Sequence, residues 1–109
     1  MFKAAVGMLV LMGMVAPAFG QDAKVAQGEK VYLEQKCAMC HSIGDKGNKK
    51  GPLDGVASKL KMEEIHEWIV DAKGMTAKTK AARKPVMRAY TLPKEDVDAL
   101  VAYLMTLKK

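Results

Sequence analysis

Two cysteines and a histidine in the pentapeptide Cys37-Ala38-Met39-Cys40-His41 constrain this chain more than any other feature. Two thiols three residues apart, followed directly by an imidazole, suit covalent attachment of haem. The thiols would add to the two vinyl groups as thioethers, and the histidine would then lie under the iron and ligate it. The rest of the chain must therefore pack around a large apolar ring.

Other chemistries also use a pair of cysteines at this spacing. A zinc site would have to recruit Cys37, Cys40 and His41 together with the distant His66, which is an unusual spacing. A redox dithiol of the thioredoxin type needs a βαβ pattern, which is missing from this sequence. A structural disulfide would close a very small ring. Haem attachment is the favoured interpretation, with zinc binding and dithiol chemistry as alternatives.

With these residues in place, the sequence resembles the class I monohaem cytochromes c. The resemblance covers nearly all of the chain after the first twenty or so residues. It implies a small all-α cytochrome c-type fold, in which N- and C-terminal helices pack around one haem c bound covalently through Cys37 and Cys40. It also implies export, because cytochromes of the c type mature outside the cytoplasm.

Residues 1–20 look like a secretory signal peptide. Lys3 is their only charge, residues 4–16 are apolar, and Ala18-Phe19-Gly20 offers small residues for cleavage. Cleavage after Gly20 would leave residues 21–109 as one exported, periplasmic domain. A transmembrane anchor is the alternative, although the apolar stretch is short for a span of about 20 residues. Membrane association would need this segment uncleaved, or a membrane-bound partner.

Three helices are expected in the mature chain. The first spans about 25–36, and the resemblance implies that its Gly28 and Tyr32 pack against the C-terminal helix. A short second helix spans 62–72. In the last helix, Pro93 is expected at the first position and lysines at the end, and the apolar residues recur at helical spacing. Residues 42–61 are expected to be loop and residues 73–90 a connector, with no convincing strand.

The resemblance assigns three further residues to the haem. It implies that the carbonyl of Pro52 accepts a hydrogen bond from the free N–H of His41, a contact that fixes the ring orientation of a metal ligand. Leu53 is expected to line the haem pocket. Trp68 is expected to pack near the haem, with its indole N–H towards a propionate. The plainer interpretations are an ordinary turn proline and a tryptophan that only fills the core.

A methionine thioether is the expected second axial ligand. The mature chain offers five methionines: Met39, Met62, Met75, Met87 and Met105. Met87 is the prediction, because it follows Pro85 closely and precedes Tyr103 by sixteen residues, close to the spacing in the resembling family. Met75 is the alternative. Iron held between His41 and a methionine has no open coordination position, which suits electron transfer rather than oxygen chemistry.

Electron transfer through one covalent haem is therefore the expected function, and no substrate pocket or acid–base pair indicates an enzyme. A haem subunit of a periplasmic oxidoreductase and a haem-based gas sensor are the alternatives. The stretch from Ala72 to Lys94 contains seven cations and no acidic residue: Lys73, Lys78, Lys80, Arg83, Lys84, Arg88 and Lys94. This pattern favours an acidic redox partner over nucleic acid, and the plainer interpretation is a solvated loop.

Overall fold

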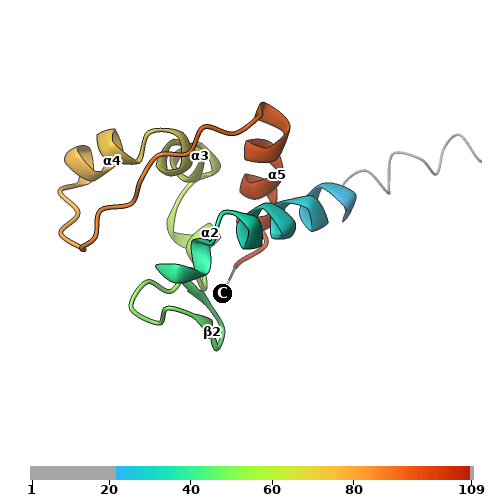
Figure 1. Cartoon of the computed structure of the whole chain (residues 1–109), viewed down its shortest axis with the longest axis horizontal. Helices are drawn as coiled ribbons and strands as arrows, with labels where there is room; N and C mark the ends of the chain where they lie inside the picture. Colours follow the sequence, from blue (N-terminus) through green and yellow to red (C-terminus); the bar gives the residue numbers. More distant parts are fainter. Residues whose placement is uncertain (1–21, 109) are drawn as a thin grey trace, which may run out of the picture.

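The first and the last helix of the described chain cross each other on one side of the fold (Figure 1). The computed structural model describes residues 22–108, so the predicted signal peptide lies outside the described residues. The N-terminal helix occupies residues 22–34, and α5 spans Lys94–Leu104. Most of the described chain is helical, which confirms the predicted all-α class. Within residues 22–108, no helix is long and apolar enough to cross a membrane.

Gly28 lets the N-terminal helix approach α5 closely. A Cβ atom at this position would lie 2.6 Å from the Cβ of Tyr103 and would overlap the carbonyl oxygen of Ala99. One turn later, Tyr32 packs edge to face on Tyr103, with ring centroids 5.8 Å apart and planes at 60°. The predicted packing of Gly28 and Tyr32 on the C-terminal helix is thus confirmed.

The core fills the space beside this crossing, and α3 (Met62–Val70) supplies its third side. Its buried residues are Val31, Tyr32, Ile65, Ile69, Val97, Leu100, Val101 and Leu104. The apolar stripe expected on the last helix is therefore buried as predicted. Burying one such side chain fully contributes about 1.5–3 kcal/mol.

The segment after α3 differs from the prediction, because Asp71 ends one helix and begins another. The helix predicted over 62–72 stops at Val70, and α4 spans Ala72–Thr79. The carboxylate of Asp71 accepts a hydrogen bond from the backbone N–H of Gly74 at 3.2 Å, which satisfies a free donor in the first turn of α4. The predicted connector is consequently helical over its first part and irregular only after it.

Short elements also occupy the segment predicted as loop. A 3₁₀ turn, η1 (Cys37–Met39), precedes a two-stranded antiparallel hairpin of β1 (Ser42–Ile43) and β2 (Lys46–Gly47), and α2 (Val56–Lys59) follows. The expectation of no strand is therefore wrong for these four residues. Strands of two residues carry too little alternation to be seen in a sequence.

The boundaries of α5 also differ from the expected ones. Pro93 directly precedes the helix with an extended ψ of 149°, rather than occupying its first position. The helix ends at Leu104, so the lysines expected at its end lie beyond it. Leu107 still packs against the core from this tail.

Candidate haem site

The pentapeptide forms a tight turn directly after the N-terminal helix. Lys36 adopts a left-handed conformation with φ 57°, which redirects the chain into η1. The backbone N–H groups of Cys40 and His41 then both donate to the carbonyl of Cys37, at 3.1 and 2.9 Å. Both cysteines are free and half-buried. The structure therefore sets Cys37, Cys40 and His41 in one tight turn, the local arrangement in which a haem would be attached.

The imidazole of His41 is oriented by a backbone carbonyl. Its Nδ1 lies 3.0 Å from the oxygen of Gly51. A nitrogen that faces a carbonyl carries the proton, so the lone pair is left on Nε2, the atom available to a metal. Burial lowers the pKa of His41, the contact with Gly51 opposes this, and the nearby charge of Arg83 lowers it further. The ring is thus biased towards the neutral form that ligates iron.

The acceptor predicted for this contact was the carbonyl of Pro52, and that prediction is wrong by one residue. Ser42 and Pro52 form an isolated parallel bridge. Its hydrogen bonds run from Ser42 N to Gly51 O at 3.1 Å and from Leu53 N to Ser42 O at 2.8 Å. This register turns the carbonyl of Gly51 towards residues 41 and 42. Pro52 itself is exposed, and the half-buried Leu53 packs against the core.

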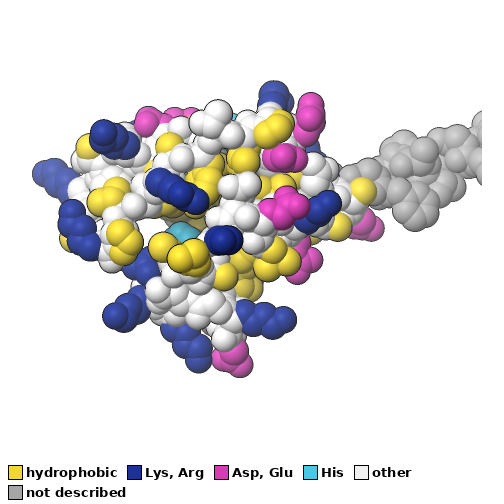
Figure 2. Space-filling view, in the orientation of Figure 1, with side chains coloured by type: hydrophobic (Ala, Val, Ile, Leu, Met, Phe, Trp, Pro, Cys, Tyr) yellow, Lys and Arg dark blue, Asp and Glu magenta, His cyan; other side chains and the backbone are white. Residues whose placement is uncertain are grey.

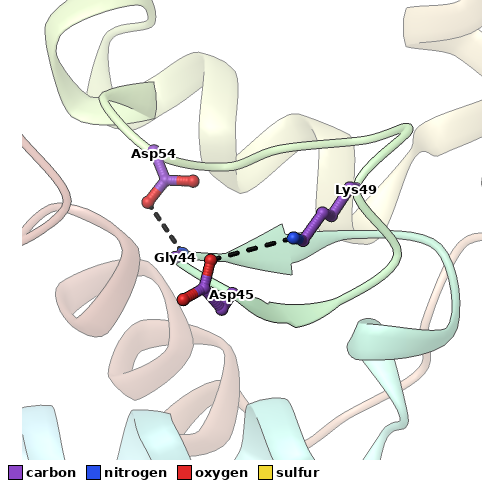
Figure 3. Close-up of polar contacts among 4 residues, drawn as sticks. All are labelled: Gly44, Asp45, Lys49 and Asp54. Carbon is purple, nitrogen blue, oxygen red and sulfur yellow. Dashed lines mark hydrogen bonds and ion pairs between the residues drawn. The ribbon is translucent and has the colours of Figure 1, made fainter.

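Asp54 ties the hairpin to the loop that carries Gly51 (Figure 3). Its Oδ1 accepts a hydrogen bond of 2.9 Å from the backbone N–H of Gly44, at the tip between β1 and β2. In the same region, Lys49 and Asp45 form an exposed ion pair at 3.8 Å. The hairpin and the loop therefore form one unit beside the histidine.

The connector also reaches this unit. A Cβ atom on Gly51 would lie 2.8 Å from the guanidinium carbon of Arg83 and would overlap the carbonyl oxygen of Cys40. Gly51 is therefore needed for close packing between the connector, the loop and the attachment turn. The sequence did not predict the contacts of Gly51 with Arg83 and with Cys40, because contacts between distant segments have no local sequence signal.

Further along, the connector is fixed to α3. The N–H of Tyr90 donates to the carbonyl of Ile69 at 2.9 Å, and Arg88 stacks over the Tyr90 ring at 5.2 Å. Burial raises the pKa of the Cys37 thiol to about 11, and the charge of Arg88 acts against this rise. The end of the connector therefore lies within electrostatic reach of the attachment turn.

The two candidate methionines differ in setting. Met87 is half-buried in the irregular part of the connector, whereas Met75 is buried on α4. Met39 and Met62 are 70% and 53% exposed. Trp68 is half-buried on α3. None of the described contacts joins Met87 or Trp68 to His41. The roles of these two residues at the haem therefore stay predictions.

A hollow opens on one face of the molecule, and a histidine side chain is visible at its floor (Figure 2). Hydrophobic side chains lie next to the opening, and Lys and Arg side chains gather on the side of α4 and the connector. Two thiols and an imidazole with Nε2 left for a metal are donors that a covalent haem uses, and the connector offers a half-buried thioether at Met87. The residues present therefore fit this group.

The described residues do not show the group of side chains that the zinc alternative requires. Within residues 22–108, no three Cys, His, Asp or Glu side chains gather in a way that would hold a metal ion. His66 lies on α3, where its Nδ1 is 3.4 Å from Glu67. The fourth ligand that a zinc site would need is thus engaged on a helix surface.

Comparison with known proteins agrees with the geometry. The family model described as "Cytochrome c" matches residues 25–108. The chain is 33% identical over 92 residues to cytochrome c oxidase subunit 2 of Alkalihalophilus pseudofirmus, an alignment covering 75% of this chain and 25% of the relative. The chain thus spans about a quarter of that relative's length. No solved structure gives a significant match.

Proposed function

The chain belongs to the cytochrome c family, and on this basis we propose that it carries single electrons between protein partners, with His41 and Met87 as the axial ligands of its haem. Family membership implies one haem c, bound covalently through Cys37 and Cys40. The observation that carries the proposal is the contact of His41 Nδ1 with Gly51 O at 3.0 Å. It selects the tautomer whose Nε2 ligates iron.

The protein residues would hold the haem and set its properties. When bound, the haem supplies a reversible one-electron centre. Cys37 and Cys40 anchor the ring, and His41 presents a basic nitrogen strengthened by Gly51. Met87 would supply a thioether, a ligand that raises the reduction potential relative to a second histidine. Iron held by both His41 and Met87 would have no position open to a small molecule.

The proposed redox partner carries an acidic surface. The seven cations of the connector and of the start of α5, without a carboxylate between Ala72 and Lys94, support this proposal. Arg83 and Arg88 bring the positive charge to the attachment turn itself. A positive field next to the site of electron exchange would steer an acidic partner and raise the rate of productive encounter.

Export belongs to the same proposal. Covalent haem attachment outside the cytoplasm agrees with residues 1–20 acting as a signal peptide that is cleaved after Gly20. Mass spectrometry of the mature protein purified from the periplasm tests this directly. A mature chain that still begins at Met1 in the membrane fraction would replace the cleaved signal by an anchor.

A haem-bearing subunit of an oxidoreductase complex is the second candidate function. The similarity to cytochrome c oxidase subunit 2 is the observation that favours it. The two candidates predict different states of the native protein. A free carrier purifies alone at about its own mass, whereas a subunit co-purifies with its complex in mild detergent.

Acid–acetone extraction is the test of the proposed cofactor. Protein matured with the export machinery should keep its haem on the chain, because thioether bonds survive this treatment. Its reduced visible spectrum should be that of a low-spin c-type haem. Complete extraction of the haem, or one equivalent of zinc in its place, would contradict the proposal.

A further inference from the structure

Asn48 makes more hydrogen bonds around the attachment turn than its neighbours in the hairpin. Its backbone N–H is shared between the carbonyls of Ala38 at 3.0 Å and His41 at 2.9 Å, and its own carbonyl accepts from Gly51 N at 3.1 Å. Its side-chain Nδ2 donates to the carbonyl of Met39 at 3.1 Å. All of these partners lie in the turn that carries the haem ligands or in the loop that carries Gly51.

The orientation of this side-chain amide is fixed by its partners. Oδ1 accepts a hydrogen bond of 3.0 Å from the backbone N–H of Lys50, while Nδ2 faces a carbonyl. If the amide were reversed, Oδ1 would face the carbonyl oxygen of Met39 and Nδ2 would face the N–H of Lys50. The side chain of Asn48 thus uses one donor, Nδ2, and one acceptor, Oδ1. Aspartate retains only the acceptor, and alanine retains neither.

The chain is shaped to bring Asn48 to this place. Gly47, with φ 101°, precedes it in a conformation that favours glycine. A Cβ atom on Gly47 would lie 3.1 Å from Ser42 Cα and would overlap the carbonyl oxygen of His41. The end of β2 therefore passes directly over the attachment turn, and Asn48 is the first residue after it.

We propose that Asn48 is a positioning residue that holds the attachment turn at a fixed distance from the Gly51 carbonyl and so sets the orientation of the His41 ring. One side of Asn48 binds the turn through Ala38, Met39 and His41. The other side binds the loop through Lys50 and Gly51. Asn48 thereby links the Gly51 oxygen, which accepts the hydrogen bond from His41 Nδ1, to the backbone that carries His41. This inference rests on the ligand role proposed for His41.

Three variants of the haem-loaded protein test this role. Asn48→Asp keeps the acceptor for Lys50 but removes the donor to Met39, and Asn48→Ala removes both. Lys49→Ala is the matched control, because it lowers the net charge by one as Asn48→Asp does. Its side chain is 71% exposed, and it forms an ion pair with the fully exposed Asp45.

The readouts are the paramagnetically shifted haem-methyl resonances of the ferric protein and the reduction potential. The methyl pattern reports the orientation of the axial imidazole, which a loss of global stability alone would leave unchanged. Both Asn48 variants should shift the methyl pattern. Asn48→Ala should also raise the potential, because a weaker contact with Gly51 makes His41 a less basic ligand. Lys49→Ala should keep the wild-type methyl pattern.

An unchanged methyl pattern in Asn48→Asp, or an equal change in Lys49→Ala, would overturn the inference. If Asn48→Ala fails to accumulate, Asn48→Asp alone decides, since it retains the acceptor and all backbone contacts. A wild-type protein whose haem lacks a histidine ligand would instead contradict the proposed function. The two failures are therefore distinguishable in the same set of spectra.

Discussion

The hydroxyl of Tyr32 is buried, and it has no hydrogen-bond partner among the described residues. Leaving such a group unpaired costs about 1–3 kcal/mol. Burial raises the pKa of Tyr32 to about 12, and Cys37, Tyr103 and Asp54 add to the effect. Tyr32 therefore contributes its ring to the helix crossing, while its hydroxyl is an energetic cost.

Replacing Tyr32 by phenylalanine should therefore change stability in a pH-dependent way. At neutral pH, Tyr32→Phe should be neutral or stabilising. As pH rises from about 10 to 12, an unfolded tyrosine loses its proton while Tyr32 keeps it, so the wild type loses up to about 3 kcal/mol of stability that the variant retains. Denaturant unfolding of the haem-loaded protein at pH 7 and 11 measures the difference.

Tyr90→Phe is the control for this comparison, because it removes a hydroxyl from a half-buried ring in the connector. It should leave the alkaline loss of stability in place. A Tyr32→Phe protein that loses as much stability as the wild type between pH 7 and 11 would contradict the account.

Met87 and Met75 are separated by one spectroscopic test. Met87→Ala should abolish the weak red absorption band that marks Met–iron ligation in the ferric state, and it should lower the reduction potential, because the thioether favours reduced iron. Met75→Ala removes a buried side chain and should cost about 2–5 kcal/mol of stability. It should nevertheless keep the band. Loss of the band in Met75→Ala alone would make Met75 the ligand.

At the scale of elements, prediction succeeded where an apolar period was long. The stripe of α5 was visible in the sequence, because an amphipathic helix repeats one face over several turns. The packing of Gly28 and Tyr32 was implied by the family resemblance and not by the apolar period. α4 was missed because Gly74 and two threonines interrupt its pattern. It begins at the cap that Asp71 provides, and the hydroxyls of Thr76 and Thr79 donate to carbonyls four residues earlier, at 2.8 Å.

For the haem site, the sequence predicted the chemistry of the residues but not their tertiary contacts. The chemistry of Cys37, Cys40 and His41 follows from residue types at fixed spacing, which a sequence displays. The acceptor for His41 depends on the register of a bridge between residues ten apart, and a shift of one residue exchanged Pro52 for Gly51. The role of Asn48 depends on contacts between the same loop and the attachment turn, so no local sequence pattern predicted it.

The crossing of the N-terminal helix and α5 can be tested with a single methyl group. Gly28→Ala gains about 1 kcal/mol of helix propensity, but its Cβ would overlap the backbone of Ala99. We expect a net loss of about 1–3 kcal/mol in the free energy of unfolding. Gly74→Ala is the comparison: the nearest atoms to its Cβ belong to the Asp71 side chain, which can rotate away at the loss of its hydrogen bond to Gly74 N–H, so we expect a loss of no more than about 1 kcal/mol. A loss at Gly28 no greater than at Gly74 would contradict tight helix packing.

At the scale of the whole molecule, charge is unevenly distributed. The chain carries a formal net charge of +6. Lys and Arg side chains gather over the side of α4 and the connector and around the hairpin, whereas Asp and Glu side chains lie mainly over the side of α5 and the N-terminal helix (Figure 2). On α5, Asp98 is paired with Lys94 at 2.8 Å, and this hydrogen bond lowers the pKa of the carboxyl. The resulting charge asymmetry would orient an approaching partner towards the hollow.

Reversing one charge near the hollow tests this orientation. In Lys84→Glu, electron transfer to ferricyanide, an anionic oxidant, should become slower, while transfer to a cationic cobalt complex should become faster. Both differences should shrink as salt rises, because screening acts over about 10 Å at 0.1 M ionic strength. Lys24→Glu changes the same charge on the N-terminal helix and should have a smaller effect. The absorption spectrum of the haem should be unaltered in both variants. Rates that respond neither to salt nor to Lys84→Glu, or that respond equally to Lys24→Glu, would leave the connector as a solvated loop without a docking role.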